Sequence, residues 1–431
     1  MGLCGLLALA AAGGPARALD VQEAGTAIAG SSGSPDLNTL LGAVIGLGPP
    51  GVEAAAWLAL NPEEAATGGT AGVEMSSAAV VNVGARLVSL RAGAGSLFSF
   101  NGSAYARPVL LALADTGTAS DAPPVTAGTG GFRRLGFFLN ASGSYGDRDS
   151  SVAAPGPGPD FAFAGEPGFD FDAWGLTGGA DYRLADGLVA GISGSYSSAE
   201  ADLDFAAGSL EADQYAVSAY GTFYTGPFYV DAIATFGWTD YEARRTVSVP
   251  AIGVGASARS DFDGDHFSVS LGAGYDVARG GWTAGPYGRL SYFEADIDGY
   301  REEISGTAEE QAARLAIGKQ EIDSLQSALG AQVSYALSTQ VGVLVPQLRL
   351  EWVHEFQDDS RDIEARWVEN TTNVTPFAIP TDDPDRNFFH LGVGLSGQFP
   401  HGVAGFLYYE TPLGLEDVVT HNVTGGVRFA F

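Results

Sequence analysis

From Phe132 to the C-terminus, apolar side chains recur at every second position in run after run of the sequence. In the last run, N-V-T-G-G-V-R-F-A-F, Val427, Phe429 and Phe431 share one face, and small or charged residues share the other. A period of two residues is typical of a β-strand. A strand with one apolar and one polar face fits a sheet that separates hydrocarbon from water. The repetition therefore favours an all-β membrane fold.

We expect about twelve such strands between Leu135 and Phe431, an even number as in bacterial outer-membrane barrels. One strand, P-Q-L-R-L-E-W-V-H-E-F, alternates with particular clarity, because Leu348, Leu350 and Trp352 oppose Arg349, Glu351 and Glu355. Pairing the first strand with the last removes both sheet edges, which lipid would not tolerate. The sequence predicts an antiparallel transmembrane β-barrel over residues 132–431.

The connections between these runs differ in length. The short ones lie at 184–187, 224–227, 278–281, 338–340 and 399–402. The long ones lie near 147–168, 240–265, 296–322 and 357–386, with shorter members near 198–212 and 411–418. Short and long connections alternate along the chain. This alternation is typical of outer-membrane barrels, which have short periplasmic turns and long external loops.

Composition excludes several classes of protein. The net charge is −30 with a single lysine, Lys319, and such a field repels nucleic acid. No run approaches 18 apolar residues, so no transmembrane helix is expected. Cys4 is the only cysteine and lies in the N-terminal apolar stretch, so neither a disulfide nor a thiolate metal site is expected.

The N-terminal part reads as a series of segments. Residues 1–18 resemble a signal peptide that ends in an A-x-A pattern at Ala16 and Ala18, with a frayed apolar terminus as the alternative. Residues 19–73 form a short passenger remnant or helical linker region. It begins unstructured up to Ser34 and continues as two short helical pieces. A flexible linker rich in Gly, Ala, Thr and Pro is expected at 92–131.

Between these segments, residues 74–91 predict a helix with many small side chains. A thin helix fits inside a pore, although an ordinary surface helix has the same pattern. Arg86 and Arg91 lie toward its C-terminal end, where the helix dipole favours cations. Two arrangements remain open: Arg349, Glu351 and Glu355 pair with these arginines across the lumen, or they pair with one another and with water.

Taken together, these features resemble the translocator domain of classical autotransporters over about residues 55–431. The motifs are the terminal R-F-A-F, the strand P-Q-L-R-L-E-W-V-H-E-F, and L-N-P-E-E-A followed by the helix at 74–91. The resemblance implies a twelve-stranded barrel with an α-helix in the pore, in the bacterial outer membrane. It implies export or display of the N-terminal segment at the cell surface.

The resemblance also implies partners. Val427, Phe429 and Phe431 would form the signal that the barrel-assembly machinery reads, after delivery by periplasmic chaperones. Outer-membrane lipid and lipopolysaccharide would surround the barrel, which we expect to be a monomer without a cofactor.

The chain departs from that family in two respects. Only about fifty residues separate the signal from the helix, too few for a repetitive β-helical passenger. We therefore expect either a truncated start or a cargo that is lost, small or separate. Some members cleave the helix at an Asn-Asn pair, but Val81 precedes Asn82 here, so no such cleavage is predicted.

Few residues in the sequence suggest a metal site or a catalytic site. Asp261, Asp263 and Asp265 resemble part of a calcium loop without its distal glutamate, so we expect a solvated external loop, as at 381–386, with weak cation binding as the alternative. The five histidines lack metal spacing, and no nucleophile-elbow motif follows the linker. We predict no metal site and no enzyme activity.

Two other functions remain as alternatives. The first is a stand-alone outer-membrane barrel, either a porin-like channel or an adhesin that acts through acidic external loops. The second is a soluble β-rich enzyme, which fractionation into the soluble periplasm would favour.

Overall fold

The computed structural model describes residues 20–47, 50–62, 64–91, 135–149, 168–204, 207–372, 374–381, 383–399 and 403–429. The predicted signal peptide and the predicted linker at 92–131 lie outside these ranges. The longer helices are α1 (Val21–Ile28), α2 (Pro35–Ile45), α3 (Pro50–Leu58) and α4 (Glu64–Arg91). None of the helices in the described part of the chain combines the length and apolarity needed to cross a membrane.

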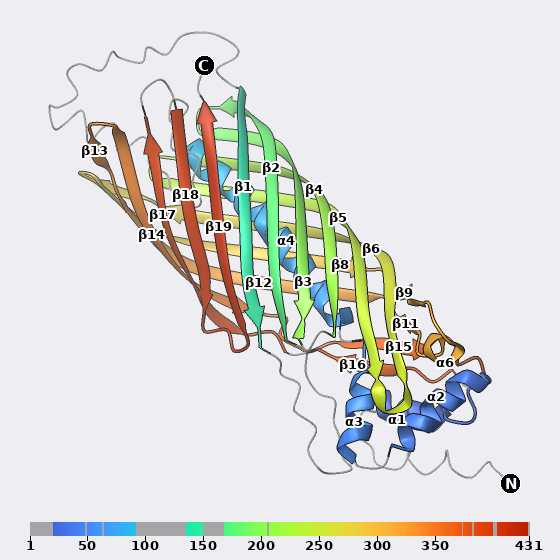
Figure 1. The fold of residues 1–431 in the computed structure, drawn as a ribbon. Helices are drawn as coiled ribbons and strands as arrows, with labels where there is room; N and C mark the ends of the chain where they lie inside the picture. The colour runs from blue at the N-terminus through green and yellow to red at the C-terminus, as the bar shows by residue number, and fades with distance from the viewer. Residues whose placement is uncertain are drawn as a thin grey trace.

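Twelve strands of the described chain close into an antiparallel barrel (Figure 1). They are β1 (Leu135–Arg148), β2 (Phe169–Ala185), β3 (Leu188–Leu203), β4 (Gly208–Thr225), β5 (Phe228–Val249), β6 (Val254–Tyr275), β8 (Trp282–Ile297), β12 (Gln320–Tyr335), β14 (Gly342–Glu355), β17 (Asn387–Gln398), β18 (Val403–Leu413) and β19 (Val418–Phe429). Two three-residue strands, β7 (Val277–Arg279) and β13 (Leu337–Thr339), extend the hairpins to β8 and β14. The predicted fold class and strand number are confirmed.

Closure depends on the pairing of β1 with β19, from Asn140 opposite Gly426 to Arg148 opposite Val418. Every other barrel strand pairs with its sequence neighbours in the barrel, so no edge remains open to lipid. The tight turns at one end include Gly187 and Gly280, whose φ angles of +82° and +61° favour glycine.

The two faces of the barrel wall have the reverse of the polarity found in a soluble protein. Large apolar side chains such as Phe137 and Ile192 point outward and are 65% and 69% exposed. Small polar side chains such as Thr177, Thr235 and Ser270 point inward and are buried. An apolar exterior and a polar interior are what a barrel surrounded by lipid requires.

We call the part of the barrel with this apolar exterior the membrane zone. Strands β5 and β6 continue beyond it. Along β5, Phe236 and Trp238 face outward, but the next outward residues are Asp240 and Glu242. The inward face changes at the same level from polar to apolar, since Tyr241 and the alternate positions after it are buried. The segment 240–265, which we expected to be a long loop, is therefore mostly strand. It ends in a turn at η3 (Pro250–Ile252).

Two more of the long connections, 296–322 and 357–386, also fold at this end of the barrel, whereas most of the one at 147–168 lies outside the described residues. The first contains β9 (Tyr300–Arg301), β10 (Glu303–Ile304), α6 (Ala308–Gln311) and β11 (Leu315–Ile317), and the second contains β15 (Asp362–Trp367) and β16 (Phe377–Pro380). Strands β16, β15, β11 and β9 form a second sheet in that order. We call these elements, together with the extension of β5 and β6 over residues 240–263, the platform.

Helices α1, α2 and α3, the cap helices, lie against the platform (Figure 1). Helix α1 falls in the stretch that we expected to be unstructured. Asp20 caps it by accepting a hydrogen bond from the Glu23 backbone N–H, and the Glu23 carboxylate accepts from the Asp20 N–H. This reciprocal capping box starts the helix, and burial of Val21 and Ile28 stabilises it.

Candidate functional site: the barrel lumen

Helix α4 extends from one end of the barrel to the other. It begins at Glu64, before the predicted start at Glu74, and ends at the predicted Arg91. Near its start, the Ala65 carbonyl accepts a hydrogen bond from Gln320 Nε2 of β12. Near its end, Arg86 contacts Asp181 of β2, close to the tight β2–β3 turn. At 1.5 Å per residue the helix is about 42 Å long, enough to pass through a membrane barrel.

Asn82 joins the C-terminal half of α4 to the barrel wall. Its Nδ2 donates to Ser142 Oγ at 3.1 Å and to Thr177 Oγ1 at 3.2 Å. Asn140 Nδ2 in turn donates to the Asn82 backbone carbonyl at 3.0 Å. These bonds run in both directions between one helical turn and two adjacent strands, so they set the axial position of the helix.

One turn later, Arg86 forms a buried ion pair. Its Nε lies 2.6 Å from Asp181 Oδ2, and the two side chains are 1% and 4% exposed. The guanidinium also lies over the Phe138 ring, 5.5 Å from its centroid, and Tyr220 donates to Asp181 at 3.4 Å. The apolar side chains of Val83, Leu87 and Leu90 pack beside this pair against the barrel wall.

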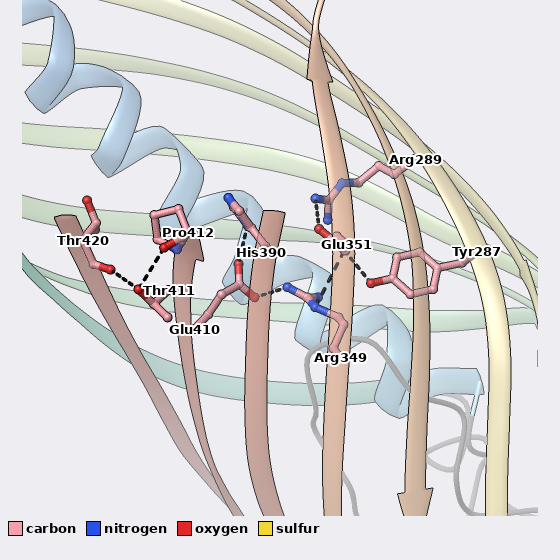
Figure 2. Close-up of polar contacts among 9 residues, drawn as sticks. All are labelled: Tyr287, Arg289, Arg349, Glu351, His390, Glu410, Thr411, Pro412 and Thr420. Carbon is pink, nitrogen blue, oxygen red and sulfur yellow. Dashed lines mark hydrogen bonds and ion pairs between the residues drawn. The ribbon is translucent and has the colours of Figure 1, made fainter. Parts of the chain in front are cut away.

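A second cluster of charges lies on the opposite wall and centres on Glu351 of β14 (Figure 2). This carboxylate accepts from Tyr287 at 2.6 Å and from Arg289 Nη2 at 3.1 Å. The Nε of Arg349, on the same strand, lies 3.7 Å from Glu351 Oε1. Glu351 is fully buried and its charge is compensated by these two arginines.

Arg349 links this group to Glu410 of β18, with which its Nη2 forms an ion pair and a hydrogen bond (Figure 2). His390 Nδ1 lies 2.9 Å from the other carboxylate oxygen of Glu410. The Arg349 guanidinium also lies 5.4 Å from the centroid of the Tyr408 ring. Four strands, β8, β14, β17 and β18, are joined in this way through side chains in the lumen.

The charged residues predicted for the lumen thus do not form a single group. Arg86 pairs with Asp181 rather than with Glu351 or Glu355. Arg349 and Glu351 pair within the wall, which is the second of the two arrangements left open by the sequence. Glu355 accepts backbone N–H groups of Leu325, Phe356 and Gln357 and stabilises the end of β14. Arg91 is the last residue of α4.

A cavity of about 290 Å³ lies between α4 and the second cluster. The helix contributes Met75, Val80 and Val81 to its lining. The barrel contributes charged groups such as Arg289 and His390, together with several serines. The helix is therefore held against one side of the lumen, and space beside it remains.

The remaining candidate residues do not form a reactive site. Asp261, Asp263 and Asp265 lie on β6 with their side chains exposed on its outer face, so the expected loop is a strand. Within the described residues, no group of three or more His, Cys, Asp or Glu side chains could hold a metal ion. Val427 and Phe429 lie in β19, and Phe431 lies outside the described residues.

Sequence reasoning missed three residues that hold these clusters, Asn140, Asp181 and Glu410. Each lies on the polar, inward face of its strand. A search for inward-facing charged or amide side chains could have found them, but their partners come from distant strands.

Comparison with known proteins agrees with this architecture. A family model for the autotransporter beta-domain matches residues 162–410, more than half of the chain. The translocator domain of the autotransporter NalP from Neisseria meningitidis has a similar fold, with a TM-score of 0.51 and 15% identity. The alignment covers 71% of this chain and 90% of that one.

Two curated relatives, the esterases EstA of Pseudomonas aeruginosa and Pseudomonas putida, are each 26% identical over 200 residues. Each match covers 45% of this chain and 29% of the relative. The chain thus matches less than a third of the length of these relatives. Because the family model spans most of the barrel and the fold agrees, this chain belongs to the autotransporter beta-domain family, and its barrel lies in the bacterial outer membrane.

Proposed function

We propose that the barrel carries the N-terminal segment of its own chain across the outer membrane and displays it at the cell surface. Helix α4 is then the part of the chain that stays in the lumen. The short turns face the periplasm, and the platform and cap helices face the outside.

The observation that carries this proposal is the path of the chain through the barrel. The cap helices lie at the platform end, α4 runs along the lumen, and β1 begins at the end with the tight turns, where Leu135 pairs with Tyr182. A chain arranged in this way has its N-terminal segment on one side of the membrane and the start of its barrel at the other.

Surface proteolysis of intact cells tests this arrangement. An epitope tag inserted after Gly30, in the exposed turn between α1 and α2, should be removed by external protease. The same tag after Gly280, in a tight turn with open space around it, should be protected until the outer membrane is breached. Protection of the Gly30 tag in intact cells would contradict export.

We further propose the partners that such a barrel needs. The barrel-assembly machinery would read Val427, Phe429 and Phe431, periplasmic chaperones would deliver the chain, and lipopolysaccharide would contact the outer face. Deletion of Phe431 should lower the amount of heat-modifiable, folded barrel in the outer membrane. An unchanged amount would remove this residue from the signal.

We also propose that the chain has no catalytic activity of its own, as its sequence predicts. The esterase relatives make ester hydrolysis the reaction to test, although each matches over only 29% of its length. Hydrolysis of short-chain p-nitrophenyl esters by the purified chain above the rate of a heat-denatured control would contradict this proposal.

The cavity beside α4 favours a second candidate, a porin-like channel. Planar-bilayer recording distinguishes the two functions. A channel predicts stable conductance from the intact chain, whereas a sealed translocator predicts conductance only after residues 64–91 are deleted. Equal conductance with and without the helix would show that α4 does not obstruct the pore.

A further inference from the structure

The cap helices are too short to be stable by themselves. They contain 8, 11 and 9 residues, and isolated helices shorter than about 12–15 residues are marginal in water. A segment of about forty residues also buries too little surface to form an independent core. Their order in this protein must therefore come from what they pack against.

That packing partner is the platform. Trp57 of α3 is fully buried, as is Trp367 of β15, and a Cβ built on Gly25 of α1 would approach rings of both. A single apolar core contains residues from the cap helices, from the β5–β6 extension and from the second sheet. The cap helices and the platform thus share one core, to which both contribute.

The inner face of the platform is built for such contact. In the barrel, the inward side of β5 carries polar residues such as Thr235 and Thr239, but beyond the membrane zone it carries Tyr241, Val247 and Val249. Without a cover, an apolar inner face at that level would be exposed to water. It is buried because the cap helices cover it.

Polar contacts fix the two parts in register. Arg245 of β5 forms two hydrogen bonds of 2.6 Å with Glu302, and its side chain is 3% exposed. The same guanidinium lies 3.5 Å from the carbonyl oxygen of Ala59, just after α3. At the other edge, the backbone N–H groups of Thr371 and Thr372 donate to the Ser32 carbonyl at 2.9 and 3.2 Å.

We propose that the platform is the docking site on which the exported segment, residues 20–60, folds after crossing the membrane and by which it stays at the cell surface. This inference rests on the proposed export function. It adds that the segment is held by non-covalent contacts with the barrel's own external extensions, not only by its covalent link to α4.

The proposal has a consequence for the order of events. The platform residues of the core that orders the cap helices lie beyond the membrane zone, so the segment crosses the lumen before it adopts its final fold. Burial of Trp57 and its neighbours then occurs only on the outer side and opposes return.

The test separates the covalent link from the docking contacts. A site for a sequence-specific protease is inserted between Pro62 and Glu64, where α3 connects to α4, in the otherwise intact chain. Cells are treated from outside, washed, and divided into membrane and medium, and the N-terminal fragment is quantified by the tag after Gly30. We expect the cut fragment to remain with the outer membrane.

Two further variants keep the result interpretable. Trp57→Ala in the same background should lower retention of the cut fragment by about 100-fold or more. Ile45→Ala, at an exposed position of α2, should leave retention unchanged. Heat-modifiable migration of each uncut variant shows that its barrel has folded, independently of the cap helices.

Each outcome has a distinct meaning. A site that external protease cuts in the purified, folded protein but cannot cut in intact cells contradicts the export function itself. Cutting followed by release of the wild-type fragment overturns the docking proposal and leaves export intact. Retention that Trp57→Ala does not alter also overturns it, because the shared core would then not hold the fragment.

Discussion

Arg86 of α4 and Asp181 of β2 form an ion pair between the lumen helix and the barrel wall, 2.6 Å from Nε to Oδ2. Both side chains are almost fully buried, and the pair is accompanied by hydrogen bonds of Asn82 one turn earlier. A charge removed from water is stable only while its partner is present. This pair therefore couples the position of the helix to the fold of the wall.

Arg86→Met should destabilise the protein, because it leaves Asp181 buried without its cation. We expect a loss of about 3–5 kcal/mol in the free energy of unfolding, measured by denaturant titration in detergent micelles. The double variant Arg86→Met/Asp181→Leu should recover most of this loss, since no buried charge remains. A double variant as unstable as the single one would show that the ion pair is not the cause.

Gly25 and Gly42 offer a matched pair of substitutions in the cap helices. A Cβ at Gly25 would lie 2.4 Å from two ring atoms of Trp57, whereas a Cβ at Gly42 would meet nothing within 4 Å. Gly25→Ala should cost roughly 1–3 kcal/mol through overpacking. Gly42→Ala should stabilise α2 by about 0.5–1 kcal/mol. Resistance of the cap helices to added protease in intact cells measures both effects, and equal effects at the two positions would contradict the packing of α1 on Trp57.

Acidic side chains face one another across β5 and β6 just outside the membrane zone. Asp240 is directly opposite Asp263, and Glu242 is opposite Asp261, all on the outer face. Like charges in opposed positions destabilise a sheet. The lone lysine, Lys319, lies 3.0 Å from Asp296 and 3.4 Å from Glu321, which are opposed in the same way on β8 and β12. The nearby Asp296 carboxylate raises the pKa of Lys319.

Asp263→Asn should therefore raise the thermal midpoint at low ionic strength. The free energy of unfolding should increase by roughly 0.2–1 kcal/mol. The gain should shrink in about 1 M salt, where charges are screened over a few ångströms. Glu211→Gln is the control of opposite sign, because Glu211 pairs with Arg244 at 3.0 Å. A salt-independent gain would point to a cause other than repulsion.

Asp358 and Arg386 connect the segment after β14 to the start of β17. Arg386 Nη2 donates to Asp358 Oδ1 at 2.6 Å, and this arginine holds the pKa of the Asp358 carboxyl below its usual range. A carboxyl with a depressed folded-state pKa stabilises the protein above its unfolded pKa, about 3.9, and loses that contribution as the pH falls through the folded value.

The wild type should accordingly lose more thermal stability than Asp358→Asn between pH 5 and about pH 2. The difference between the two midpoints isolates this carboxyl from the others that titrate in the same range. Parallel pH profiles would show that the pair does not contribute to stability.

The period-two pattern and the alternation of turn lengths were sufficient to predict the barrel. Lipid on one side and polar groups on the other dictate which residues face outward at each position. The small residues of α4 likewise indicated a helix thin enough for a pore. These properties are local, and each can be read within a single strand or helix.

The pairing of charges in the lumen could not be read in this way. Arg86 and Asp181 are 95 residues apart in the sequence. Arg349 of β14 pairs with Glu410 of β18, and β17 lies between these two strands in the barrel. Which acid meets which base depends on barrel closure and on the axial position of the helix. The sequence alone left both arrangements possible.

The alternating pattern was enough to specify a closed barrel, since strands of this kind have no other stable arrangement in lipid. The structure of residues 20–34 and of the long connections, which the sequence indicated as loose segments, and the packing of the two short helices predicted after Ser34, depend on contacts that form only in the folded protein. Short helices such as α1 and short strands such as β9 contain too few residues to produce a recognisable pattern in the sequence. They become stable together, when Trp57 and Trp367 are buried in a core that neither segment can form alone.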